Sequence, residues 1–194
     1  MFSQPDNICF EIPDWVNEYC SNYQASPELN KRVAFVITAS RMNVEEGSGG
    51  PFAAAIFEKG TGELVSLGVN LVEAQRSSML HAEMVAIAVA QARLATYDLG
   101  SASAAGYELV TSTEPCTMCL GGVLWSDVNK VVAAARDEDA RAIGFDEGPK
   151  PDDWIKSLND RGIEVLDDVE RDSARSVLQM YKESKGHIYN SRKR

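Results

Sequence analysis

Three side chains with metal-binding chemistry lie in two short motifs, His81-Ala82-Glu83 and Pro115-Cys116-Thr117-Met118-Cys119. One imidazole and two thiolates make three ligands that zinc accepts, and they leave one tetrahedral position open. A structural zinc site normally takes all four ligands from the protein, whereas an open position admits water. The residue types therefore indicate a catalytic zinc ion bound by His81, Cys116 and Cys119.

A carboxylate lies beside the expected metal, because Glu83 follows His81 by two positions. Two thiolates neutralise the charge of zinc, so the metal alone should acidify water less than a site with three histidines would. A nearby base is needed to accept the water proton, and Glu83 is placed to do so. The same group can return the proton to a leaving group, so we expect a hydrolytic reaction, with no redox cofactor.

Each motif taken alone has a simpler interpretation. A lone histidine is more often a partly buried, hydrogen-bonded residue, and Cys-x-x-Cys at a helix start also occurs in thiol–disulfide sites or structural zinc sites. Cys9 and Cys20 are eleven positions apart, which is too far for a second close ligand pair, and we interpret them as free thiols. The two motifs occur together in a chain with two histidines, and this combination favours catalytic zinc.

The elements that must position these motifs alternate along the chain. We expect a first helix over residues 27–43, with Ser26 as its N-cap and Pro27 at its first position. Further helices are expected over 80–97, 116–125, from about 138, 154–159 and 169–184, and strands over 52–58, 63–70, 107–111, 130–135 and 163–166. This order predicts an α/β fold with helices on both faces of a central mixed sheet. Cys116 and Cys119 then share one face of a helix start, where the helix dipole favours thiolates. His81 and Glu83 must lie at an irregular helix start, since a regular helix would point them apart.

Length and charge limit the functional classes. A chain of 194 residues predicts one domain over 1–194, with an N-terminal extension over about 1–26 and a C-terminal tail over about 185–194. We find no leader pattern and no apolar run long enough for a bilayer, so we expect a cytoplasmic protein with no membrane contact. The net charge of −10 argues against nucleic acid as a partner, and the basic cluster Arg192-Lys193-Arg194 is interpreted as a solvated tail.

Residues 52 to 147 resemble the cytidine deaminase-like superfamily, and specifically its bacterial guanine deaminase branch. His-x-Glu followed by Pro-Cys-x-x-Cys is the known signature of zinc-dependent nucleobase deaminases. Three further segments carry the resemblance: Pro51-Phe52-Ala53-Ala54-Ala55, Gly68-Val69-Asn70 and Gly144-Phe145-Asp146-Glu147-Gly148-Pro149. The resemblance implies a three-layer α/β/α sandwich, a homodimer, one zinc per chain on the two motifs, and Glu83 as the proton shuttle.

The resemblance also implies residues that contact the base. Asn70 matches a base-binding asparagine, and Phe52 and Phe145 match positions that close on the base, although Phe52 is equally interpreted as core. Ala82 is included among the substrate-binding residues. Tyr189 lies in a tail that reaches an active site in this branch, either of its own chain or of the partner chain.

The pair Asp146-Glu147 decides the expected substrate. The guanine edge with N1–H and the 2-amino group offers adjacent donors to a carboxylate, whereas cytosine offers acceptors. We therefore expect guanine to be converted to xanthine and ammonia, with Glu147 catalytic and Asp146 in contact with the base. The alternatives are a cytosine, cytidine or tRNA-adenosine deaminase, and a catalytically silent, zinc-stabilised interaction protein.

Overall fold

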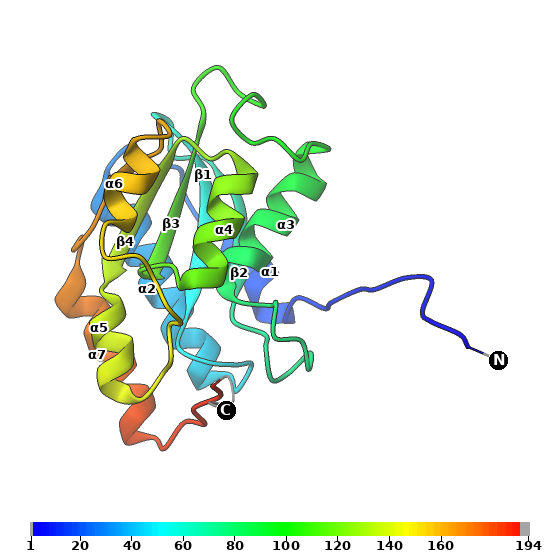
Figure 1. Ribbon diagram of the computed structural model, residues 1–194, viewed down its shortest axis with the longest axis vertical. Helices are drawn as coiled ribbons and strands as arrows, with labels where there is room; N and C mark the ends of the chain where they lie inside the picture. Colours follow the sequence, from blue (N-terminus) through cyan, green and yellow to red (C-terminus); the bar gives the residue numbers. More distant parts are fainter. Residues whose placement is uncertain (1, 191–194) are drawn as a thin grey trace.

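A five-stranded open sheet in the order β2-β1-β3-β4-β5 forms the middle layer of the structure, a computed structural model that describes residues 2–190 (Figure 1). The strands are β1 (Ala53–Glu58), β2 (Leu64–Val69), β3 (Tyr107–Thr113), β4 (Lys130–Ala135) and β5 (Glu164–Leu166). β1 is antiparallel to both β2 and β3, whereas β3, β4 and β5 run parallel. The predicted mixed sheet is confirmed. The basic cluster 192–194 and the last residues of the predicted tail lie outside the described residues.

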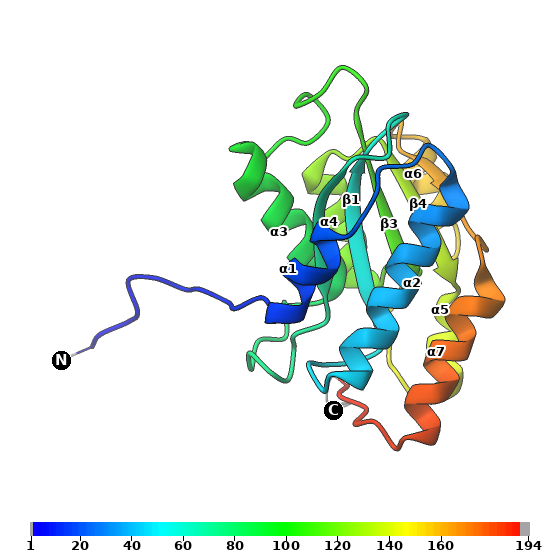
Figure 2. The ribbon, with the colours of Figure 1, turned by 180° about the vertical axis from the view of Figure 1, so that it is seen from behind.

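Helices cover both faces of this sheet (Figures 1 and 2). One face carries α3 (Ala82–Leu94), α4 (Thr117–Ser126) and α6 (Trp154–Asn159), and the other carries α1 (Asp14–Ser21), α2 (Leu29–Glu45) and α7 (Arg171–Glu183). The short helix α5 (Asp137–Ile143) packs against α7. Two apolar cores, one on each face, hold the three layers together, which confirms the α/β/α sandwich.

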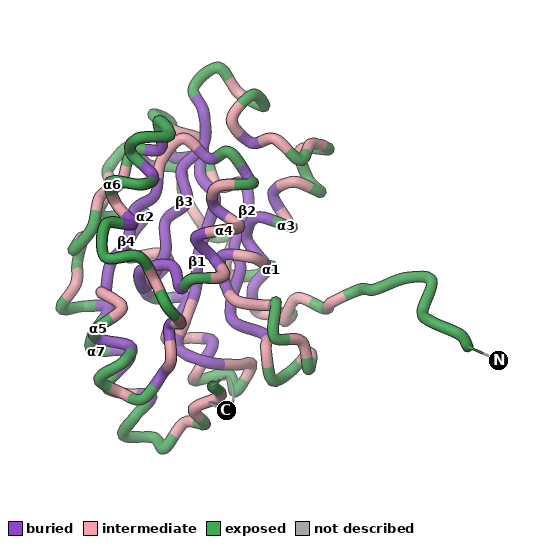
Figure 3. Tube along the Cα trace, viewed as in Figure 1, coloured by how far each residue is buried: buried purple, intermediate pink, exposed green. Residues whose placement is uncertain are grey.

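The central strands are buried on both faces, as Figure 3 shows along the middle of the chain trace. A strand covered from both sides reads as a continuous apolar run, with no alternation of polar and apolar residues. β1 (Ala-Ala-Ala-Ile-Phe-Glu) and β4 (Lys-Val-Val-Ala-Ala-Ala) both have this composition. Helices long enough to span a bilayer and apolar enough to do so do not occur among residues 2–190.

The predicted N-terminal extension contains a helix that the sequence analysis did not anticipate. α1 packs on α2 through Tyr19, whose ring stacks on Phe35 at a centroid distance of 4.5 Å and whose hydroxyl donates to the Phe35 carbonyl at 2.9 Å. Residues 2–9 are exposed and extend away from the three layers (Figures 1 and 2), whereas Phe10 and Ile12 pack against the apolar core. Part of the extension therefore belongs to the folded body.

Gly68 in β2 allows α3 to lie directly on the sheet. A Cβ atom at this position would come within 2.3 Å of the Ala82 carbonyl oxygen and 2.4 Å of the Ala86 nitrogen. These contacts are shorter than any side chain tolerates, so glycine sets how deeply α3 sits. His81 and Glu83 lie at the start of the same helix, so this packing also places the candidate site.

Candidate active site

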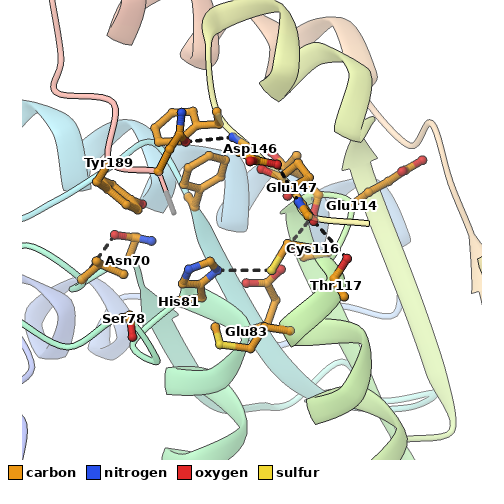
Figure 4. A pocket seen from close by; sticks show the side chains of 18 residues that line it. Asn70, Ser78, His81, Glu83, Glu114, Cys116, Thr117, Asp146, Glu147 and Tyr189 are labelled. Atoms are coloured by element: carbon orange, nitrogen blue, oxygen red, sulfur yellow. Dashed lines mark hydrogen bonds between the residues drawn. The ribbon is translucent and has the colours of Figure 1, made fainter. Parts of the chain in front are cut away.

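The three predicted ligands meet at the starts of two neighbouring helices, and Figure 4 shows two of them, His81 and Cys116. The ligand atoms of His81, Cys116 and Cys119 lie within 4.8 Å of one another, and His81 Nδ1 is 3.4 Å from Cys116 Sγ. Tetrahedral zinc with bonds of about 2.0–2.3 Å places its ligand atoms roughly 3.5–3.8 Å apart. The donor set and its spacing therefore fit zinc.

Local backbone geometry explains the unusual spacing of the first motif. His81 is the N-cap residue of α3 and has an extended backbone, while Glu83 lies in the first turn of the helix. Cys116 is likewise the extended N-cap residue of α4, and Cys119 lies inside that helix. The irregular start predicted for the first motif is therefore present, and it lets His81 and Glu83 face the same site.

The two thiols are strongly coupled. The hydrogen bond from Cys119, together with the nearby His81, lowers the pKa of Cys116 to about 4, while the same hydrogen bond and burial raise the pKa of Cys119. The pair then shares one proton at neutral pH, and metal binding would displace it. The helix starts favour the resulting negative charge.

Glu83 is buried against this group. Its Oε2 accepts a hydrogen bond from Cys119 Sγ at 3.4 Å, and the side chain is 7% exposed. Burial, followed by the charge of Cys116, raises the pKa of Glu83 to about 7. A cation between the ligands would counter the Cys116 charge and lower this pKa again. A buried carboxylate beside the ligands is suited to accept and return a proton, as acid–base chemistry requires.

A cavity of about 500 Å³ opens onto Glu83 and the ligands. The predicted site residues that line it are Phe52, Asn70, His81, Glu83, Cys116, Phe145, Asp146, Glu147 and Tyr189. Cys119 and Ala82 are not among the lining residues; Ala82 is fully buried behind His81. Six segments that are distant in the sequence thus converge as the sequence analysis expected, while the contact predicted for Ala82 stays a prediction.

Three polar groups of Asn70 form hydrogen bonds that fix the residue in the cavity wall: the backbone nitrogen, the backbone carbonyl and the side-chain oxygen Oδ1. Its backbone nitrogen donates to the Phe52 carbonyl at 3.0 Å, and its carbonyl accepts from Asn43 Nδ2 at 3.0 Å. Its Oδ1 accepts from the Val72 nitrogen at 3.3 Å. This last bond orients the side-chain amide, so that the Nδ2 donor is left for a ligand.

The neighbouring carboxylates Asp146 and Glu147 have different surroundings. Asp146 Oδ1 accepts from the Gly148 nitrogen at 3.0 Å and caps a tight turn. Glu147 is 9% exposed, and its carbonyl is held by Thr117 N at 3.1 Å and Thr117 Oγ1 at 3.2 Å. Burial, and then the charges of Cys116 and Glu83, raise the pKa of Glu147 to about 8. The charges of the metal-ligand group therefore act directly on the Glu147 carboxylate.

Aromatic rings close one end of the cavity. The Phe145 ring lies edge-on to Phe52 at 4.9 Å between centroids and edge-on to Tyr189 at 5.3 Å. Phe145 is buried in a small cluster with Tyr181, whereas Phe52 and Tyr189 are partly buried. Phe52 packs against both sheet cores as well, so its packing role and its predicted contact with a base are compatible.

The C-terminal tail crosses the cavity of its own chain. Asn190 Oδ1 accepts from the Asp146 nitrogen at 2.9 Å, and Asn190 Nδ2 donates to the Gly144 carbonyl at 2.9 Å. His187 pairs with Glu73, which lies in the loop between β2 and α3. Tyr189 lies opposite Glu147 in Figure 4, and its buried hydroxyl has no hydrogen-bond partner among the described residues.

The sequence analysis missed several residues of the cavity. Thr111 and Thr113 line it from the end of β3, two positions apart on one face of the strand. Glu114 also lines it, and its Oε2 accepts from Lys150 Nζ at 2.5 Å in a pair that is almost fully buried. Strand periodicity could have identified the two threonines. No local signal links Glu114 to Lys150, because they are 36 positions apart.

Comparison with known proteins decides the family. The family model for the cytidine and deoxycytidylate deaminase zinc-binding region matches residues 28–135, more than half of the chain. The chain belongs to this family. The protein is therefore a zinc-dependent aminohydrolase, and its His/Cys/Cys group fits the zinc-binding region of that family.

Individual relatives agree with the guanine deaminase branch. The chain is 37% identical to guanine deaminase from Bacillus subtilis (strain 168) over 111 residues. This matched region covers 57% of this chain and 67% of that protein. It is similar to the solved structure of guanine deaminase from Nitrosomonas europaea, with 40% identity, a TM-score of 0.88, and coverage of 94% of this chain and 100% of that one. A solved variant in complex with 8-azaguanine matches with 39% identity and a TM-score of 0.89, over 94% and 100% of the two chains. The predicted resemblance is confirmed.

Proposed function

We propose that the protein hydrolyses guanine to xanthine and ammonia. The observation that carries this substrate is the buried carboxylate of Glu147, which shares a cavity with Glu83 and the zinc ligands. Guanine presents N1–H and its 2-amino group as adjacent donors, and a carboxylate accepts both. A relative of the same fold binds the guanine analogue 8-azaguanine, and this supports the same choice.

Glu83 is proposed to move the protons of the reaction. A bound zinc ion would supply Lewis acidity, which makes a water molecule nucleophilic near neutral pH. Glu83 accepts a proton from this water as the oxygen bonds to C2 of guanine, and it passes the proton to N3. The remaining hydroxyl proton then goes to the amino nitrogen as the bond from C2 to nitrogen breaks. Water and guanine are consumed, and xanthine and ammonia are formed.

Glu147 has two proposed roles that its burial makes compatible. Its carboxylate accepts hydrogen bonds from N1–H and the 2-amino group and so orients C2 toward the site. Because burial raises its pKa to about 8, the same carboxylate can take up the remaining hydroxyl proton as the bond from C2 to nitrogen breaks and pass it to the departing amine. Asp146 is the weaker candidate for base contact, since its carboxylate already accepts from Gly148.

The remaining cavity residues are proposed to bind the base. Asn70 offers its free Nδ2 donor to a ring acceptor, and its rigid hydrogen bonds make this donor selective. Phe52 and Phe145 close on the flat faces or edges of the purine. Tyr189 is proposed to place its unpaired hydroxyl against the base, and Ala82 to contribute through its position beside His81.

We further propose one zinc per chain, a single deaminase domain over 1–194, a homodimer, and a cytoplasmic role in purine catabolism without nucleic-acid partners. Exposed Trp125 on α4, 87% accessible, supports a partner surface on that layer. Cys9 and Cys20, which form no disulfide, suit a reducing compartment. The net charge of −10 disfavours binding to a polyphosphate.

A substrate screen tests the proposal. Purified protein is assayed for ammonia release from guanine, cytosine, adenine and their nucleosides, with xanthine formation followed by its ultraviolet spectrum. We expect guanine to have the highest kcat/KM. A clear preference for cytosine or for a nucleoside would contradict the guanine assignment while leaving the zinc-dependent aminohydrolase intact.

A further inference from the structure

The turn that carries Glu147 is held by side chains and by little regular structure. It lies between Gly144 and Gly148, whose φ angles are +115° and +73°. Glycine at both ends gives the segment wide conformational freedom, so its native shape must be fixed by contacts from outside. Those contacts decide where the carboxylate of Glu147 points.

One side chain contacts both neighbours of Glu147. Arg141, in the last turn of α5, donates from Nη2 to the Gly148 carbonyl at 2.8 Å, and its Nη1 lies 3.7 Å from Asp146 Oδ1. The same guanidinium bonds Asp137 at the start of α5, at 3.2 Å. The planar fork of an arginine is suited to join several acceptors at once.

We propose that Arg141 is a positioning residue for the reaction, which fixes the turn Asp146-Glu147-Gly148 so that the Glu147 carboxylate faces the His81, Cys116 and Cys119 group. This inference rests on the proposed role of Glu147. Arg141 does not line the cavity, so it acts through Glu147 and not on the base.

Charge gives Arg141 a second effect on the same turn. Asp137 and Asp146 both lie beside the Arg141 guanidinium, and Lys150 lies between Glu114 at 2.5 Å and Asp137 at 3.6 Å. Without a cation at Arg141, Asp137 keeps Lys150 as a partner, whereas Asp146 loses the ion pair that ties the turn to α5. A displacement of about 1 Å in a positioned group is enough to lower a rate up to about 100-fold.

A matched control exists at the other end of the same helix. Arg136, the N-cap residue of α5, has a side chain 41% exposed against 40% for Arg141. It bonds Asp168 through Nε at 2.8 Å and Nη2 at 2.5 Å, and among the described residues it forms no hydrogen bond or ion pair with the turn 144–148. Arg136→Met therefore removes a similar guanidinium and a similar ion pair without touching Glu147.

The test is a double-mutant cycle with Glu147→Gln, measured on the base that the wild type deaminates fastest, with zinc content and Tm as checks on the fold. When Glu147 is present, Arg141→Met should lower kcat/KM about tenfold. In the Glu147→Gln background the same substitution should lower it less than about twofold. Arg136→Met should change kcat/KM less than about twofold in both backgrounds. Because the substrate is the base that the wild-type enzyme deaminates fastest, the result does not depend on that base being guanine.

Two outcomes would overturn the inference. One is an equal loss from Arg141→Met in both backgrounds, which means that Arg141 acts independently of Glu147. The other is an equal loss from Arg136→Met, which means that any ion pair on α5 has the same effect. Should Arg141→Met fail to fold, Arg141→Lys replaces it in the cycle, because lysine keeps the charge near Asp137 but lacks the fork.

Discussion

The zinc-binding side of the cavity and the base-facing side are built in different ways. His81, Glu83, Cys116 and Cys119 lie at the starts of α3 and α4, two helices that pack on the sheet and on each other. On the base-facing side, Glu147 and the tail depend on hydrogen bonds between loops. Rigid elements thus hold the reacting groups, while loops hold the groups that select the base. We expect losses of function to be complete on the first side and graded on the second.

The largest effect should come from the metal ligands. Cys116→Ala and Cys119→Ala each leave two protein ligands, so we expect zinc to be lost and activity to fall below detection. Metal analysis and turnover of each purified variant check this. Cys20→Ala, a half-buried thiol far from the site, should keep both zinc and activity. Full zinc occupancy in either ligand variant would break the assignment.

The next effect should come from Glu83. Glu83→Gln keeps the shape of the side chain but cannot accept a proton, so kcat should fall about 10²- to 10⁴-fold with zinc retained. Steady-state kinetics with metal analysis measure both quantities, and Glu45→Gln on the exposed end of α2 is the control. Wild-type kcat in the Gln variant would remove Glu83 from the mechanism.

The smallest effect should come from the tail. Tyr189→Phe removes a buried hydroxyl that has no partner among residues 2–190, so it should raise KM for guanine about 2- to 10-fold if the hydroxyl bonds the base. Zinc content and kcat should change little. Tyr97→Phe, at an exposed position, serves as control. An unchanged KM together with a higher Tm would show that the hydroxyl is only an unsatisfied buried group.

The sequence predicted the zinc-binding side well because its signals are local. Cys116 and Cys119 share a helix face through their spacing, and the alternation of apolar runs placed both motifs at helix starts. The strand over 130–135 and the helix over 154–159 occur with the predicted bounds. α1 was missed because eight residues give too short a periodic pattern, and its packing depends on Phe35 of another helix.

The base-facing side was predicted only by its residue types. Asp146 and Glu147 were both expected at the base, and both line the cavity. Their difference comes from the folded turn, in which Asp146 Oδ1 accepts from the Gly148 nitrogen while Glu147 is buried. Arg141 gave no signal, since its bond to the Gly148 carbonyl involves a backbone atom that any residue offers. Contacts of this kind follow from the folded loop and not from residue types.

The close packing of α3 on Gly68 restricts which other protein scaffolds could accept the zinc motif. Copying His-x-Glu and Cys-x-x-Cys onto another sheet would reproduce the ligand types but not the depth of the first helix, which here depends on a missing methyl group in β2. A receiving scaffold with alanine at the equivalent strand position would hold His81 and Glu83 farther out than the two cysteines. Design of new metal sites on this architecture therefore begins in the strand beneath the helix.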